Sequence, residues 1–85
     1  MAYRVDVQSK ARREVDALPA DYRRRLIAAI AALADEPRPR GTKKLKARAD
    51  WGIRIGPYRV VYSIFDGDQL VVVTRVTRRT TTTYD

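Results

Sequence analysis

The feature that most constrains the fold is the pair Gly56-Pro57, which lies between two runs of strand-forming residues. Gly tolerates a positive φ and Pro fixes its own φ, so this pair predicts a tight turn. Residues 58–65 are mostly β-branched and aromatic, which is typical of a strand in the body of a sheet. Alternation predicts that the inward-facing residues of this strand are Tyr58, Val60, Tyr62 and Ile64. Arg59 then projects from the opposite face, close to Arg54 across the turn.

The first half of the chain predicts one strand and two helices. Residues 3–8 alternate apolar and polar side chains, which indicates a half-buried strand. Residues 10–18 form a short amphipathic pattern, with Ser9 as the expected N-cap. Residues 20–36 form a longer pattern that ends at Pro37. The apolar positions at helical spacing are Ala11, Val15 and Leu18 in the first helix and Tyr22, Leu26, Ile30 and Leu33 in the second.

The second half predicts a loop and a further strand. Residues 37–50 are rich in Pro, Gly and charge, so we expect a loop there. Asp66-Gly67-Asp68 marks a turn after the hairpin, and residues 70–76 form an apolar strand. Alternation groups Val71, Val73, Arg75, Thr77 and Arg79 on one face of this strand. The expected order is β-α-α-β-β-β, a single α+β domain over residues 1–85. An N-terminal strand and an αα-hairpin precede a three-stranded antiparallel meander, with the helices on one face of the sheet.

Composition excludes several kinds of chemistry. The chain has no cysteine and no histidine, so it lacks a thiol nucleophile and the commonest general base and metal ligand. Its net charge is +8, and residues 37–64 carry eight basic side chains against one acidic residue, Asp50. A focused basic patch favours a polyanion partner, above all nucleic acid, over an acidic protein or a merely solvated loop. No signal peptide or membrane-spanning run is present, so we expect a cytoplasmic protein.

The candidate site is built from basic residues and one tyrosine. The residues concerned are Arg54, Arg59, Arg78, Arg79 and Tyr84. Arginine is a poor base, but it holds phosphate and stabilises negative charge that develops in a transition state. The basic residues expected to contact RNA or the ribosome from the loop are Lys43, Lys44, Lys46 and Arg48. In the alternative interpretation, the arginines only keep the surface soluble and Tyr84 packs on the sheet edge. The acidic residues are scattered, so we expect neither a metal nor another cofactor.

The chain resembles the RelE/ParE toxins of bacterial toxin–antitoxin systems over essentially its whole length. The most specific match is the hairpin, residues 53–62, with the sequence Ile-Arg-Ile-Gly-Pro-Tyr-Arg-Val-Val-Tyr. Weaker matches are residues 11–19 in the first helix, residues 44–46 in the loop, and the C-terminal residues 75–84. The resemblance implies the same β-α-α-β-β-β fold.

The resemblance to RelE also implies roles for individual residues. Arg54 matches a basic residue of the first hairpin strand, and Arg59 matches the arginine that binds the scissile phosphate. Arg79 matches the arginine that assists the leaving oxygen, and Tyr84 matches the tyrosine that stacks on or orients the substrate nucleotide. Gly52 departs from the pattern, because ribonuclease members often have a second basic residue there. Arg78 stands where a histidine or lysine is often found.

Three functions are compatible with this pattern. The first, implied by the RelE branch, is a type II toxin that cleaves messenger RNA in the ribosomal A site, without a metal, through attack of a ribose 2′-OH. The second is a ParE-type inhibitor of DNA gyrase without nuclease activity. The third is a basic nucleic-acid-binding module that is not toxic. Either toxin implies a small antitoxin with an acidic toxin-binding segment, and a complex that binds operator DNA through that antitoxin.

Overall fold

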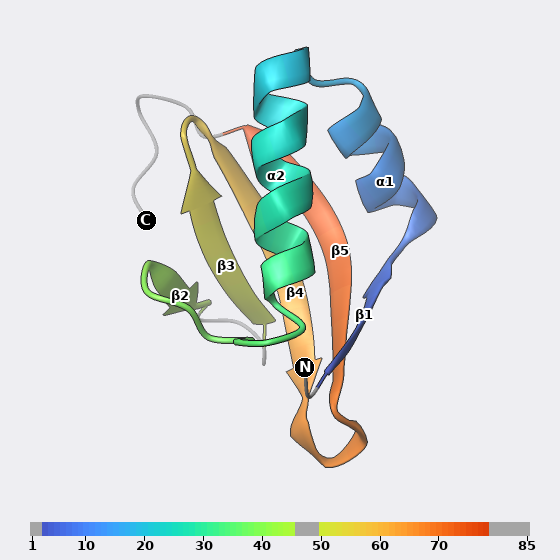
Figure 1. The fold of residues 1–85 in the computed structure, drawn as a ribbon, viewed down its shortest axis with the longest axis vertical. Helices are drawn as coiled ribbons and strands as arrows, with labels where there is room; N and C mark the ends of the chain where they lie inside the picture. Colours follow the sequence, from blue (N-terminus) through green and yellow to red (C-terminus); the bar gives the residue numbers. More distant parts are fainter. Residues whose placement is uncertain (1–2, 46–49, 79–85) are drawn as a thin grey trace.

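The computed structural model describes residues 3–45 and 50–78 and has an α+β architecture. In chain order, its elements are β1 (Arg4–Val7), α1 (Ser9–Asp16), α2 (Ala20–Ala32), β2 (Thr42–Lys44), β3 (Asp50–Ile55), β4 (Tyr58–Phe65), the 3-10 turn η1 (Asp66–Asp68) and β5 (Leu70–Arg78). The strands form one sheet in the order β1-β5-β4-β3-β2, in which β1 pairs parallel to β5 and the other neighbours are antiparallel. Figure 1 shows both helices in front of this sheet, which confirms the expected fold class.

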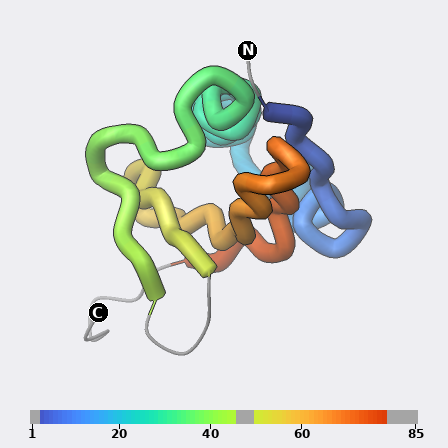
Figure 2. The backbone as a smooth tube through the Cα atoms, turned by 90° about the horizontal axis from the view of Figure 1, so that it is seen from below, coloured from blue at the N-terminus to red at the C-terminus, as the bar shows by residue number. Residues whose placement is uncertain are grey.

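The core lies between the helices and the sheet. Figure 2 looks along the long axis of the molecule and shows α2 end-on above the strands. The buried residues are Ala11 and Val15 of α1, Leu26 and Ile30 of α2, Leu33 just after it, Tyr58, Val60 and Tyr62 of β4, and Val71, Val73 and Val76 of β5. The predicted inward-facing residues of β4 are therefore confirmed at three positions, and Ile64 packs against the same core. The 13-residue α2 is too short for a bilayer, and no helix in the described ranges is long and apolar enough to cross a membrane.

The helix boundaries differ from those expected. Helix α1 begins at Ser9, and Gln8 takes the N-cap position without a side-chain hydrogen bond, so the prediction of a Ser9 cap was wrong. Helix α2 ends at Ala32 rather than Glu36. The residues after it form a turn whose carbonyl at Ala34 accepts a hydrogen bond from the backbone N of Tyr3 at 3.0 Å. The end of α2 is thus tied to the start of β1.

The segment expected to be a loop contains strand β2. Thr42, Lys43 and Lys44 pair with Ile53, Gly52 and Trp51 of β3. Gly41 has a φ of 93°, a left-handed conformation that suits glycine, and it directly precedes this strand. The Oγ1 of Thr42 lies 3.2 Å from the hydroxyl of the buried Tyr62, which also donates a 2.8 Å hydrogen bond to the carbonyl of Pro37. These tertiary contacts make an edge strand of a sequence whose charge and Pro content indicate a loop.

A β-bulge changes the alternation of β5. Val61 pairs with Arg75 but Tyr62 pairs with Val73, so Thr74 is an extra residue in the ladder. The hydroxyl of Thr74 donates to the carbonyl of Val61 at 3.3 Å. Val76 therefore returns to the core side, and Arg75 and Thr77 lie on the face away from the helices. The prediction that Arg75 and Thr77 share a face with Val71 and Val73 was wrong.

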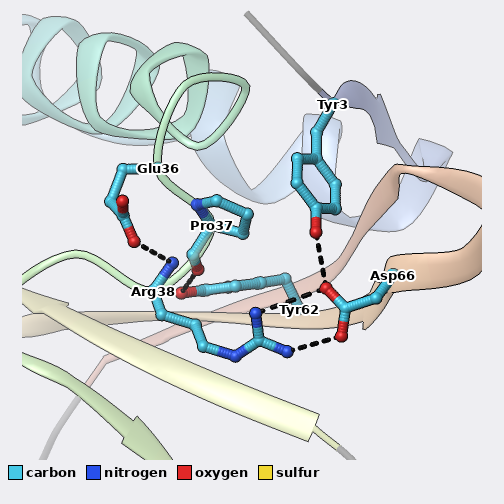
Figure 3. Close-up of polar contacts among 6 residues, drawn as sticks. All are labelled: Tyr3, Glu36, Pro37, Arg38, Tyr62 and Asp66. Atoms are coloured by element: carbon cyan, nitrogen blue, oxygen red, sulfur yellow. Dashed lines mark hydrogen bonds and ion pairs between the residues drawn. The ribbon is translucent and has the colours of Figure 1, made fainter.

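A polar cluster ties three segments together at one end of the sheet (Figure 3). Arg38 donates two hydrogen bonds to the carboxylate of Asp66, at 2.8 and 3.3 Å, and the Tyr3 hydroxyl donates a third at 2.5 Å. The Arg38 guanidinium also lies over the Trp51 ring, 5.0 Å from its centroid. The pKa of Asp66 is lowered, mainly by the hydrogen bond from Arg38 and to a smaller extent by the hydrogen bond from Tyr3. We call Tyr3, Arg38 and Asp66 the polar latch, because they join the N-terminus and the β4–β5 turn to the segment that leads into β2.

Candidate functional site

The β3–β4 hairpin is held in place by α2. Ile55 pairs with Tyr58 across the two-residue turn, and Gly56 takes a φ of 58°. A Cβ on Gly56 would lie 2.6 Å from Cε1 of Tyr22, so the tyrosine ring lies directly against the glycine. The same ring meets Tyr58 edge to face, with centroids 5.2 Å apart. The glycine thus allows both the turn and the close approach of α2.

Arg54 and Arg59 lie opposite each other on the helix-free face of the sheet. They are register partners in the β3–β4 pair, and residues so paired project from the same face. Arg54 is exposed, whereas Arg59 is half-buried. The stem of Arg59 lies over Gly52, because its Cδ is 3.3 Å from the position that a Cβ on Gly52 would occupy. The structure therefore places Arg54 and Arg59 close together, as the hairpin sequence predicts.

A hollow of about 310 Å³ opens beside these arginines. It is lined by Gly41, Lys43, Gly52, Arg54 and Arg59. The strands β2, β3 and β4 thus each contribute one cation to its lining. We call this feature the basic hollow. None of the described residues that line it is acidic, so its field favours an anion, and guanidinium groups bind phosphate oxygens well.

The other predicted site residues divide into two groups. Lys44 pairs with Trp51 and lies on the face opposite Lys43, while Arg78 pairs with the core residue Tyr58 on the helix side of the sheet. Neither lines the basic hollow. The remaining predicted residues, Lys46, Arg48, Arg79 and Tyr84, lie outside the described residues.

Two residues on the face of the basic hollow were not among the site residues predicted from the sequence. Thr77 is the register partner of Arg59, and Arg75 is the partner of Val61 in the row that contains Gly52 and Lys43. The bulge at Thr74 places both on this face. A signal was present in the sequence, because the polar pair Thr74-Arg75 interrupts a run of valines where a regular strand would continue it.

A second cavity lies on the helix side of the molecule. This apolar groove of about 330 Å³ is formed by β1, α1 and α2, and its lining residues are Val5, Val7, Arg12, Val15, Asp16, Ile27, Ile30 and Ala31. Ile27 is a large apolar residue of this lining and is 52% exposed. Strand β1 is an edge strand of the sheet. The groove thus adjoins an edge that offers backbone hydrogen-bonding groups.

This fold and this basic face define the class of protein as a toxin of the RelE/ParE superfamily, as comparison with known families and structures shows. The chain belongs to the family described as the ParE toxin of the type II toxin–antitoxin system parDE, whose model matches residues 4–82. Comparison with curated protein sequences gives no match.

Solved structures agree with this assignment. A chain of the RelBE2 toxin–antitoxin complex of Mycobacterium tuberculosis is 30% identical, with a TM-score of 0.80 over 93% of this chain and 100% of that chain. A chain of the archaeal RelE–RelB complex of Pyrococcus horikoshii is 28% identical, with a TM-score of 0.85 over 95% and 99%. A chain of the Escherichia coli RelBE complex is 26% identical, with a TM-score of 0.78 over 93% and 99%.

Proposed function

We propose that this toxin is a ribosome-dependent endonuclease that cleaves messenger RNA in the A site. The observation that carries the proposal is the pairing of Arg54 with Arg59 beside a hollow that Lys43 also lines. Three cations that converge from adjacent strands suit one phosphate with a developing negative charge. The hairpin that bears both arginines is braced by Tyr22, and a rigid support of this kind favours catalysis.

The proposed reaction is attack by a ribose 2′-oxygen on the adjacent phosphorus. It yields a 2′,3′-cyclic phosphate on one fragment and a free 5′-OH on the other, and it needs no metal or other cofactor. Arg59 binds the scissile phosphate, and Arg54 adds a second positive charge beside it. Arg79 assists the leaving oxygen, and Tyr84 orients the nucleotide. The ribosome holds the RNA in line, and positioning of this kind lowers a barrier by several kcal/mol. The protein acts in the cytoplasm, where it meets translating ribosomes.

The test is primer extension on messenger RNA from cells that express the protein. We expect discrete cleavages in register with the reading frame, and little product when the purified protein is incubated with naked RNA. Double-stranded breaks in DNA without messenger cleavage would contradict the proposal. Rapid, specific cleavage of free RNA would contradict the dependence on ribosomes.

The second candidate function is inhibition of DNA gyrase. It is favoured by the family model, whose description is that of a ParE toxin. In this case the basic hollow would serve binding rather than catalysis. Supercoiling by purified gyrase in the presence of the toxin separates the two candidates. A gyrase inhibitor should block supercoiling at stoichiometric concentrations, while the proposed nuclease should leave it unchanged.

The proposed protein partner is a small antitoxin with an acidic toxin-binding segment. The solved relatives named above come from toxin–antitoxin complexes. An acidic segment would neutralise the basic hollow, and apolar side chains of the antitoxin would fill the groove beside β1. The complex would bind operator DNA through the antitoxin. Ile27→Asp should weaken co-purification with the antitoxin, because Ile27 lines the groove, whereas Asp68→Ala in the distant β4–β5 turn should leave it intact. If the antitoxin co-purifies equally with both variants, the groove is not part of the interface.

A further inference from the structure

The basic hollow contains two kinds of cation with different chemistry. Arg54 and Arg59 carry guanidinium groups, which stay protonated, whereas Lys43 carries an amine, a group that is a base in its neutral form. The described lining of the hollow includes no carboxylate or imidazole. Cleavage through a 2′-oxygen requires an acceptor for the 2′-OH proton. Among the described residues of the hollow, Lys43 alone has a side chain that can become neutral and accept it.

The register of β2 places Lys43 where such an acceptor is needed. Lys43 is the direct partner of Gly52, and opposed residues of an antiparallel pair have Cβ positions about 4.5–5.5 Å apart on the same face. Gly52 has no side chain, and the side chains of Arg59 and Leu45 cover it. Arg59 reaches over the glycine from β4, with its Cδ 3.3 Å from the position of the missing Cβ. Lys43 flanks the same glycine from β2. An anion in the hollow therefore meets both Arg59 and Lys43, which line it from the two strands that flank β3.

Strand β2 is fixed relative to the strand that bears Arg59. The Thr42 Oγ1 lies 3.2 Å from the Tyr62 hydroxyl, and Tyr62 is a fully buried residue of β4. Backbone N of Leu45 donates to the carbonyl of Asp50 at 2.9 Å, just beyond Lys43 on the same hairpin. The polar latch holds the segment that leads into β2 through Arg38. The backbone of Lys43 thus has a defined position beside the hollow, as a residue with a role in the chemical step requires.

We propose that Lys43 takes part in the chemical step as the proton acceptor, an inference that rests on the RNA cleavage proposed above. In this step the neutral Lys43 Nζ takes the proton of the ribose 2′-OH. The 2′-oxygen forms a bond to phosphorus, and the bond from phosphorus to the 5′-oxygen breaks. The 5′-oxygen leaves with the electron pair and is protonated by solvent. Arg54 and Arg59 balance the charge on the non-bridging oxygens throughout.

The experiment is single-turnover cleavage of messenger RNA on programmed ribosomes with the variants Lys43→Arg and Lys43→Ala. Lys43→Arg keeps the positive charge but cannot accept a proton, so we expect its rate to fall about 10²-fold or more while ribosome binding stays near the wild-type level. The matched controls are Lys10→Arg and Lys10→Ala, on the exposed surface of α1, which should cleave like the wild type.

Each result decides one of the two proposals. If Lys43→Arg cleaves at the wild-type rate, charge alone is sufficient at this position and the role as proton acceptor is wrong. If Lys43→Arg and Lys43→Ala lose ribosome binding to the same degree as cleavage, Lys43 is a binding residue and the inference is also overturned. Thermal melts of both variants distinguish these results from misfolding, which we do not expect at an exposed position. If the wild type itself does not cleave on ribosomes, the proposed function fails, and the inference fails with it.

Discussion

The carboxylate of Glu14 in α1 accepts a hydrogen bond from the backbone N of Val76 in β5, at 2.7 Å. Val76 follows the bulge that Thr74 introduces, and it lies beyond Val73, the last residue of β5 that pairs with β1. The bulge determines which residues of β5 face the helices and which face the basic hollow. A side chain of α1 therefore contacts β5 just beyond the bulge that places Arg75 and Thr77 on the same face as Arg59.

Glu14→Ala should destabilise the fold by about 1–3 kcal/mol, because it leaves a partly buried backbone N–H without its acceptor. Glu14→Gln should cost less, since its amide oxygen still accepts the bond. Urea unfolding measures both changes. Asp16→Ala, at an exposed position in the same helix, is the matched control and should stay within about 0.5 kcal/mol of the wild type. Equal stability of Glu14→Ala and Asp16→Ala would show that the bulge does not depend on this contact.

Arg59→Ala should lower ribosome-dependent cleavage about 10²–10³-fold, the usual effect of removing a group that stabilises transition-state charge. It should cost about 1 kcal/mol of stability or less, which corresponds to the lost packing of its stem over Gly52. Arg54 is more exposed than Arg59, so Arg54→Ala should be as stable as the wild type. Its cleavage rate should fall about as much as that of Arg59→Ala. Arg24→Ala, whose side chain pairs with Asp21 on the surface of α2, is the control. If both site variants arrest growth as the wild type does, the nuclease proposal is wrong.

Gly56→Ala should destabilise the protein by more than about 1–2 kcal/mol. Alanine at a φ of 58° is strained, and its Cβ would come within 2.6 Å of the Tyr22 ring. The displaced ring would also release the hairpin that carries Arg54 and Arg59, so activity should fall more than stability alone explains. Gly67→Ala is a good control, because within residues 3–45 and 50–78 no heavy atom beyond its chain neighbours lies within 4 Å of the added methyl group. Similar unfolding midpoints for the two variants would argue against the bracing role of Tyr22.

The polar latch predicts a particular dependence of stability on pH. Hydrogen bonds from Arg38 and Tyr3 lower the pKa of Asp66 below its ordinary value of 3.8. The unfolded chain therefore takes up this proton first as the pH falls. The stabilising effect is present above pH 3.8 and disappears as the pH falls through the lower pKa of the folded state. Asp66→Asn should lower the melting temperature at neutral pH and reduce its change between about pH 5 and about pH 2.

Thermal melts across this pH range test the prediction. Asp68→Asn changes a carboxylate in the same turn that lies outside the latch, so its melting profile should follow that of the wild type. An Asp66→Asn profile that runs parallel to the wild type at all pH values would mean that the latch does not couple to folding.

The sequence by itself determined most of the fold and the pairing of arginines at the centre of the candidate site. Local signals were sufficient for the Gly56-Pro57 turn and the inward face of β4, because turn chemistry and strand alternation act over a few residues. The opposition of Arg54 and Arg59 follows from that turn, since a two-residue connection fixes the register of both strands.

Tertiary structure decided two features that depend on contacts between residues distant in the chain, the strand β2 and the bulge in β5. Strand β2 exists because β3 and Tyr62 supply partners for Thr42–Lys44, a segment whose composition indicates a loop. Its pairing separates Lys43, in the basic hollow, from Lys44 on the other face. The bulge in β5 reverses the alternation beyond Thr74 and brings Arg75 to the site face. One inserted residue moves every later side chain to the other face of a strand, and the Glu14 carboxylate that accepts the hydrogen bond from Val76 N just beyond it comes from another element.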